Sequence, residues 1–91
     1  RTDTGMLWEN FMISERVKRN AYSGSYANLY FWRTHNQKEI DLIEEEDGQL
    51  HTFEFKWNQR SKVTMPQTFS TSYPNSTFTV ITPDSFWPFV S

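Results

Sequence analysis

The sequence predicts a mixed α/β domain in which one helix is followed by three consecutive strands, a second helix and a fourth strand. The strongest signal is Asp47-Gly48, which separates two β-rich runs. Asp-Gly in that position indicates a tight hairpin, because both turn residues adopt positive φ. Aromatic and β-branched residues at 29–34 and alternation at 77–82 indicate two further strands.

Chain length and composition set the size of this domain. The 91 residues are enough for a single domain with a modest core. Only 36% of the residues are hydrophobic, but 18% are aromatic and bring a large apolar area per residue. We therefore expect residues 1–91 to form one folded domain rather than a disordered chain.

The net charge and the residue types present limit the functions that this chain could have. The net charge of −2 gives no overall basic footprint for nucleic acid, and the absence of Cys excludes disulfides and thiolate metal sites. No apolar run approaches 18 residues and no signal peptide is recognisable, so we expect a cytoplasmic protein with no membrane partner. The chain starts with Arg rather than Met, which suggests a fragment of a longer protein.

The first helix is expected over residues 5–20, with Thr4 or Asp3 as its cap. Its apolar residues point in nearly all directions, as in a helix that packs against more than one partner. One small sheet cannot bury all of its bulky side chains. We expect at least one of three to be exposed: Trp8, Phe11 and Met12.

The remaining elements follow from local signals. Pro66 favours a helix start and Tyr73-Pro74 its end. Pro88 argues against a long last helix. The expected elements are a strand at 29–34, a turn at 34–38, a hairpin at 38–57, a polar loop at 58–64, a helix at 65–73, a strand at 77–82 and a short helix or turn at 86–89.

The hairpin turn fixes the register of its two strands. A two-residue turn at 47–48 pairs residue 46 with residue 49, so paired positions sum to 95. Asp41 then lies opposite Glu54 (41 + 54 = 95), and Glu39 lies opposite Lys56 (39 + 56 = 95). Since residues two apart share a strand face, these four side chains form one polar square. The other face is expected to be core: Ile40, Leu42, His51, Phe53, Phe55 and Trp57.

The polar square has two possible interpretations. Two carboxylates about 5 Å apart repel by roughly 3 kcal/mol at an effective dielectric near 20, so a neighbouring cation is expected. Lys56 compensates in part, and carboxylates suit Mg²⁺. The alternative is a solvated hairpin face with a Glu39–Lys56 cross-strand pair, which contributes little to stability.

Other site chemistries have little support in the sequence. His35 and His51 are far apart, so a His-based zinc site is disfavoured. The three Gly are scattered and form no phosphate-binding loop. The Ser residues lie mainly in expected loops, with no base paired to them.

The order of elements, together with Asp41 and the run Glu54-Phe55-Lys56, resembles the PD-(D/E)XK nuclease-like superfamily. That resemblance implies a restriction-endonuclease-like αβββαβ core with a mixed four-stranded sheet flanked by helices. It also implies four catalytic residues: Asp41, Glu54, Lys56 and Glu9 on the first helix. The implied metal ligands are Asp41, Glu54 and the carbonyl of Phe55, with Mg²⁺ as cofactor and Mn²⁺ as its substitute.

A second resemblance covers nearly the whole chain. Its residues are Met6 to Phe11, Tyr30 to Thr34, Glu39 to Asp41, Phe53 to Lys56, Tyr73-Pro74 and Val80 to Thr82. This pattern is similar to the C-terminal domain of bacterial and archaeal AAA-type ATPases, a domain-of-unknown-function family. The resemblance implies an N-terminal ATPase domain in the same chain as partner, and a homo-oligomer formed through it.

Two functions from different classes follow. In the first, the domain hydrolyses DNA with Mg²⁺ held by Asp41 and Glu54, while Lys56 orients water or stabilises negative charge and Glu9 acts through a water. In the second, the domain is a catalytically inactive docking or regulatory module of the ATPase. A metal at the polar square favours the first, and an exposed patch around Trp8 and Phe11 favours the second.

Overall fold

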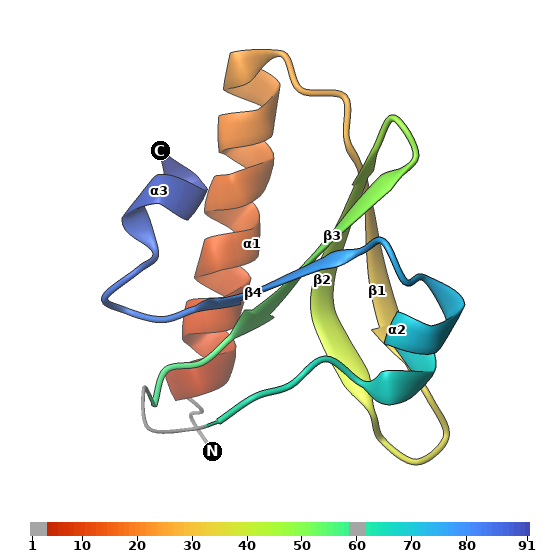
Figure 1. The fold of residues 1–91 in the computed structure, drawn as a ribbon. Coiled ribbons are helices and arrows are strands. Elements are labelled where there is room, and N and C mark those ends of the chain that lie inside the picture. The colour runs from red at the N-terminus through yellow and green to blue at the C-terminus, as the bar shows by residue number, and fades with distance from the viewer. Residues whose placement is uncertain (1–3, 59–61) are drawn as a thin grey trace.

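A four-stranded sheet with helices on both faces forms the structure, a computed structural model that describes residues 4–58 and 62–91 (Figure 1). The observed order of elements confirms the predicted αβββαβ core, and a short helix follows it where a last helix or turn was expected. The elements are α1 (Thr4–Ser23), β1 (Asn28–Arg33), β2 (Glu39–Glu46), β3 (Gln49–Phe55), α2 (Gln67–Ser72), β4 (Thr77–Ile81) and α3 (Trp87–Val90).

The sheet is mixed and has the strand order β1-β2-β3-β4. Strand β2 pairs antiparallel with both β1 and β3, whereas β4 runs parallel to β3. A parallel neighbour requires a crossover connection, and the segment containing α2 provides it. No helix within 4–58 and 62–91 is both long and apolar enough to cross a membrane.

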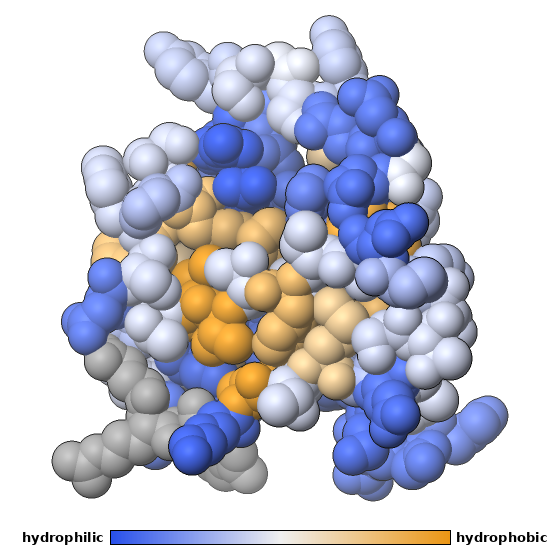
Figure 2. Space-filling view, viewed as in Figure 1, coloured by the Kyte–Doolittle hydropathy of each residue, from blue (hydrophilic) through white to orange (hydrophobic). Residues whose placement is uncertain are grey.

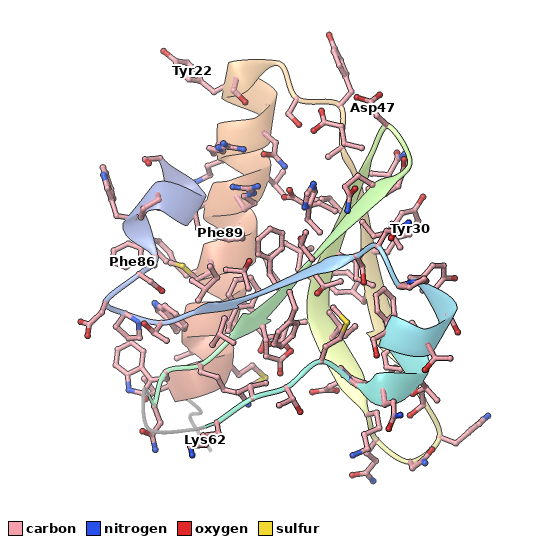
Figure 3. The ribbon with its side chains drawn as sticks, viewed as in Figure 1. Tyr22, Tyr30, Asp47, Lys62, Phe86 and Phe89 are labelled. Carbon is pink, nitrogen blue, oxygen red and sulfur yellow. The ribbon has the colours of Figure 1, made fainter. Side chains whose placement is uncertain are left out.

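Two hydrophobic clusters lie on the two faces of the sheet. Helices α1 and α3 cover one face, where Met12 and Phe89 pack against residues of β2, β3 and β4. The ring centroid of Phe89, labelled in Figure 3, lies 4.9 Å from that of Phe53. On the other face, Phe69 of α2 packs against Ile40 and Ile43. Figure 2 shows apolar residues crossing the middle of one face of the molecule, between hydrophilic ends.

The hairpin has the predicted register. Glu46 pairs with Gln49, and the ladder continues to Leu42 and Phe53, whose numbers also sum to 95. The turn residues have φ of 55° at Asp47 and 80° at Gly48, as a tight hairpin turn requires.

A bulge in β2 corrects the predicted faces of this strand. Tyr30 pairs with Ile43 but Trp32 pairs with Ile40, so two residues of β2 lie opposite the single residue 31 of β1. The extra residue reverses the alternation. As a result, Ile40 belongs to the cluster under α2, whereas Leu42 belongs to the cluster under α1.

The rest of the predicted core face is confirmed only in part. Phe53 and Phe55 are buried in the α1-side cluster as predicted. Trp57 is 50% exposed, although its ring contacts that of Trp8 at 5.8 Å, and His51 is half-buried beside the hydroxyl of Thr77. His51 lies near the start of β3, and Trp57 follows two residues after its end.

Helix α1 extends three residues beyond the predicted end at Asn20. Met12 is fully buried, Trp8 is half-buried against Phe55, and Phe11 remains 53% exposed. The prediction that one small sheet leaves part of this helix uncovered is therefore confirmed. Asp3, the alternative cap, lies outside the described residues, as does the 59–61 part of the predicted loop.

Candidate functional site

Asp41 and Glu54 meet at the point where β2 and β3 separate. The paired residues of the ladder end at Leu42 and Phe53. Beyond them, the backbone N–H of Asp41 donates to Glu54 Oε1 at 3.2 Å, and the backbone N–H of Phe55 donates to Asp41 Oδ2 at 2.8 Å. The two carboxylates thus replace backbone carbonyls as acceptors, and their predicted proximity is confirmed.

The bulge gives Asp41 its place in this site. Asp41 and Leu42 are the two residues that lie opposite Phe31. A bulge bends the strand and re-aims a side chain, and such irregularities are frequent next to active sites. Leu42 remains in the α1-side core, so Asp41 is anchored beside a fully buried residue.

Lys56 supplies the positive charge nearest to the pair. Its Nζ lies 3.9 Å from Glu54 Oε2. The backbone of Lys56 donates to the carbonyl of Ile81 at 2.9 Å, which extends the parallel pairing of β3 and β4 by one residue. This hydrogen bond fixes the backbone of Lys56, two residues after Glu54, at the edge of the site.

Glu39 does not pair with Lys56, which corrects the predicted polar square. Its carboxylate lies 3.0 Å from the guanidinium of Arg33, and the two residues are direct partners in the β1–β2 ladder. Arg33 belongs to the neighbouring strand, so the hairpin register alone does not reveal it. The site is therefore a carboxylate pair with one Lys, and Glu39 lies beside it.

The electrostatics of the carboxylate pair differ from those of ordinary surface acids. Burial raises the pKa of Glu54 to about 7, and the charge of Asp41 adds to the rise. Burial also raises the pKa of Asp41, with a contribution from Glu39, against the lowering effects of the Phe55 N–H, Glu54 and Lys56. Strongly perturbed acids in contact are a common feature of functional sites.

Glu9 reaches the same region from α1. It lines a surface hollow of about 210 Å³ that extends to Asp41, and the residues around it come from α1, β1 and β2. The structure thus places Glu9 near Asp41, while Glu54 and Lys56 adjoin Asp41 from β3. The lining residues are Glu9, Phe31, Trp32, Arg33, Glu39, Ile40 and Asp41.

The chemistry of the pair fits a hard divalent cation. Carboxylate oxygens are the ligands that Mg²⁺ prefers. The raised pKa of Glu54 means that nearby positive charge does not suffice to keep both acids ionised. In the described part of the chain, no group of three or more His, Cys, Asp or Glu residues is arranged to hold a metal ion. Asp41 and Glu54 would therefore hold a cation with few further protein ligands, the Phe55 carbonyl being the predicted one.

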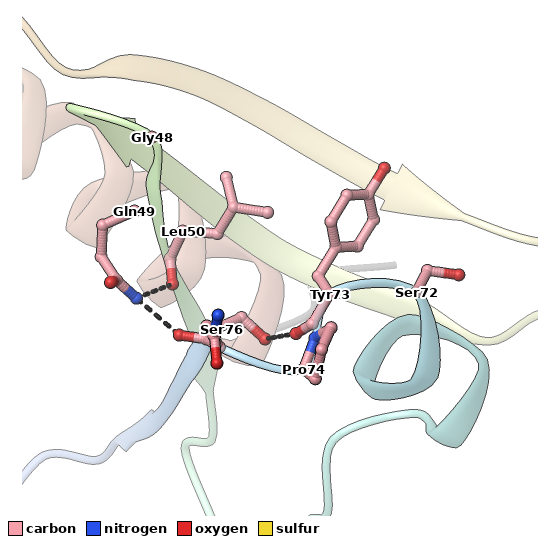
Figure 4. A pocket seen from close by; sticks show the side chains of 8 residues that line it. Gly48, Gln49, Leu50, Ser72, Tyr73, Pro74 and Ser76 are labelled. Carbon is pink, nitrogen blue, oxygen red and sulfur yellow. Dashed lines mark hydrogen bonds between the residues drawn. The ribbon is translucent and has the colours of Figure 1, made fainter.

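A second hollow, shown in Figure 4, lies at the opposite end of β3 and measures about 220 Å³. Gln49 crosses it, donating to the carbonyls of Asn75 at 2.7 Å and Leu50 at 3.4 Å. Its lining contains no carboxylate, imidazole or cation. The hydrogen bond to Asn75 ties β3 to the segment between α2 and β4. We therefore interpret this hollow as structural.

Two parts of the site were not predicted from the sequence. Phe31 and Arg33 line the hollow from β1, and the bulge brings Phe31 opposite Asp41. One sequence signal for the bulge exists: Leu42 and Ile43 are adjacent apolar residues that break the alternation of this strand. No comparable signal marks Phe31 or Arg33.

Fold and site together define an αβββαβ domain with a carboxylate pair, in which Glu54 is buried and Asp41 half-buried, and a Lys where its central strands separate. The chain matches the model of the family described as Domain of unknown function (DUF4143) over residues 4–85, and it belongs to that family. No curated protein and no solved structure matches it.

Proposed function

We propose that this domain hydrolyses phosphodiester bonds in DNA, with Mg²⁺ bound at Asp41 and Glu54. The observation that carries the proposal is the contact between these two acids next to Lys56, together with the pKa of Glu54 near 7. The resemblance to the PD-(D/E)XK nuclease-like superfamily points to the same three residues and adds Glu9. Lys56 alone does not keep the pKa of Glu54 at its ordinary value, so a divalent cation would complete the neutralisation of the pair.

Bound Mg²⁺ supplies positive charge that polarises a phosphate and lowers the pKa of a coordinated water. Asp41 and Glu54 must be ionised to hold it, so binding displaces the proton that their raised pKa values retain. The backbone N–H groups of Asp41 and Phe55 fix the orientation of both carboxylates. The pair is therefore preorganised before any cation arrives.

Lys56 and Glu9 have supporting roles in this proposal. The ammonium of Lys56 is partly exposed near Glu54, and it donates to the attacking water or to the oxygen that gains negative charge. Glu9 lines the same hollow as Asp41 and, in this proposal, accepts a hydrogen bond from a water in it. Both roles need only groups that the fold already places around the pair.

The test is cleavage of plasmid and single-stranded DNA in Mg²⁺ or Mn²⁺. We expect wild type to cleave, and Asp41→Asn, Glu54→Gln and Lys56→Ala to lose most of the activity. Glu46→Gln is the matched control, since Glu46 is an exposed acid at the far end of β2. Absence of cleavage in wild type, or equal cleavage by Asp41→Asn, would contradict the proposal.

A specific observation favours a second function, docking to an ATPase domain of the same chain. Met6, Leu7 and Phe11 of α1 are each more than half exposed and form an apolar surface near the start of the helix. Such patches often mark interaction sites. Trp8, by contrast, is partly covered by Phe55 and Trp57. In this alternative the carboxylate pair has no catalytic role, and oligomerisation occurs through the ATPase.

The docking function is tested in a chain that carries the ATPase domain. Leu7→Ser with Phe11→Ser should weaken the contact between the two domains, measured as increased hydrogen exchange in α1. Tyr22→Ser is the control, because Tyr22 is 97% exposed near the opposite end of the helix. Unchanged exchange in the double variant would refute docking through this surface.

A further inference from the structure

Phe31 is an exposed aromatic side chain next to the carboxylate pair. It is 71% exposed on β1, which is an edge strand of the sheet. It lies opposite the bulge that contains Asp41, and both residues line the hollow of about 210 Å³. An aromatic ring with so much exposed surface contributes little to the core and is accessible to a ligand in the hollow.

The hollow matches one part of a nucleotide chain. At about 210 Å³ it is smaller than the pockets that hold whole drug-sized ligands, but it has room for a flat group. An aromatic ring gives a stacking platform for a base, and such stacking tolerates any base sequence. Bases inside a duplex are already stacked on one another, so only a single strand or an unpaired end can use Phe31.

The charges of the domain also disfavour a grip on duplex DNA. Duplex binding depends on many phosphate contacts from Lys and Arg, whereas the chain has a net charge of −2. Two cations lie at or beside the site. Arg33 lines the hollow and forms an ion pair with Glu39 at 3.0 Å, and Lys56 forms one with Glu54. These two cations suit one or two phosphates rather than a long backbone, so stacking must supply much of the affinity.

We propose that Phe31 stacks a base of single-stranded DNA and thereby places the adjoining phosphate at Asp41 and Glu54. The inference rests on the proposed function and adds its substrate class: unpaired strands rather than uniform duplex. Phe31 is a positioning residue in this scheme, because it contacts the base and not the reacting phosphate. The stacked nucleotide has a phosphate on each side. One lies at Asp41 and Glu54, and Arg33 pairs with the other.

The experiment measures binding separately from cleavage. The affinity of the whole chain for fluorescein-labelled oligodeoxythymidine is followed by fluorescence anisotropy, with Ca²⁺ in place of Mg²⁺, and with a blunt duplex of the same length for comparison. We expect Phe31→Ala to weaken single-strand binding by about tenfold, since base–aromatic stacking has that order of effect. Phe31→Trp should retain the affinity.

Tyr30→Ala is the matched control on the same strand. Tyr30, labelled in Figure 3, is 51% exposed and lines a hollow next to Phe69 and Tyr73 on the α2 side. Phe31 borders that hollow as well, but Tyr30 does not line the hollow that contains Asp41. Its replacement should leave single-strand affinity unchanged. Equal losses in Tyr30→Ala and Phe31→Ala would overturn the proposal, because they would indicate a general effect on β1.

The remaining outcomes separate this inference from the proposed hydrolysis. Unchanged affinity in Phe31→Ala, equal binding of the blunt duplex, or no binding by wild type would each overturn the stacking role, even if Asp41→Asn abolishes cleavage. A selective loss in Phe31→Ala together with no cleavage by wild type would support the binding site and overturn hydrolysis. Circular dichroism of each variant confirms that it is folded.

Discussion

The guanidinium of Arg16 holds the buried carboxylate of Glu44 with two hydrogen bonds, of 2.7 and 2.8 Å. Asn20 donates a third to the same carboxylate at 3.1 Å, and Arg16 also donates to the carbonyl of Phe89 at 2.8 Å. This contact joins α1 to β2 and α3 across the α1-side core. It accounts for an acid in the middle of a buried strand.

Glu44 and Glu54 are both buried acids, yet their pKa values are shifted in opposite directions. Burial alone would raise the pKa of Glu44, but the hydrogen bonds from Arg16 and Asn20 outweigh it and hold the pKa below its usual value. For Glu54, burial and the neighbouring charge of Asp41 raise the pKa, and the charge of Lys56 at 3.9 Å does not offset them. Glu44 therefore has the features of a structural ion pair, whereas Glu54 has those of a functional acid.

The first prediction concerns this ion pair. Glu44→Ala should lower the free energy of unfolding by about 3 kcal/mol, because it leaves the guanidinium of Arg16 buried without its partner. Urea denaturation measures the change. Glu15→Ala is the control, since the Glu15–Lys18 pair is largely exposed and should contribute at most about 1 kcal/mol. Equal losses in the two variants would contradict a structural role for Glu44.

The second prediction concerns pH and Glu54. Its folded pKa of about 7 lies above the ordinary value of 4.5 that applies to the unfolded chain. Between these values the folded state binds more protons, so this group's contribution to stability is complete below pH 4.5 and is lost as the pH rises through 7. At about 1.4 kcal/mol per pKa unit, the loss is at most about 3 kcal/mol.

Glu54→Gln should remove that loss. The variant's free energy of unfolding should therefore change less than that of wild type between pH 5 and pH 8, in urea titrations without divalent cations. Glu46→Gln should follow the wild-type curve. Parallel curves for wild type and Glu54→Gln would show that Glu54 does not retain its proton in the folded state.

The third prediction concerns metal binding. Mn²⁺ should raise the melting temperature of wild type, because a ligand that binds only the folded state stabilises it, by about 2.7 kcal/mol at a hundredfold excess over its Kd. Asp41→Asn should abolish this gain and raise metal-free stability, since it removes one of two neighbouring charges. Lys56→Ala should lower metal-free stability, because it leaves the acids without their nearest cation. No shift in wild type would favour the docking function.

The hairpin was predictable because its determinants are local. Asp47-Gly48 fixes the turn, the turn fixes the register, and the register brings Asp41 to Glu54. The register between β1 and β2 could not be predicted in the same way, because it depends on tertiary contacts and not on a two-residue turn. For that reason the bulge, the Arg33–Glu39 pair and the position of Phe31 were not predicted. Arg16 and Glu44 are 28 residues apart and show no periodic relation in the sequence.

The fourth prediction uses two neighbours that act on Asp41 in opposite directions. The charge of Glu39 raises the pKa of Asp41, and the charge of Lys56 lowers it. Glu39→Gln should therefore shift the titration of the Asp41 carboxyl to lower pH, and Lys56→Ala should shift it to higher pH. Carboxyl carbon NMR of the metal-free protein measures both shifts directly.

The same pair of variants also predicts how metal binding depends on pH. Mn²⁺ binds the ionised acids, so its affinity should rise with pH through the titration of the pair. Glu39→Gln should bring that rise to lower pH, and Lys56→Ala should delay it, as measured by calorimetric titration at several pH values. Glu46→Gln, remote from the pair, should leave the rise in place. Shifts in the same direction for both variants would indicate a structural change rather than the electrostatic coupling described for Asp41.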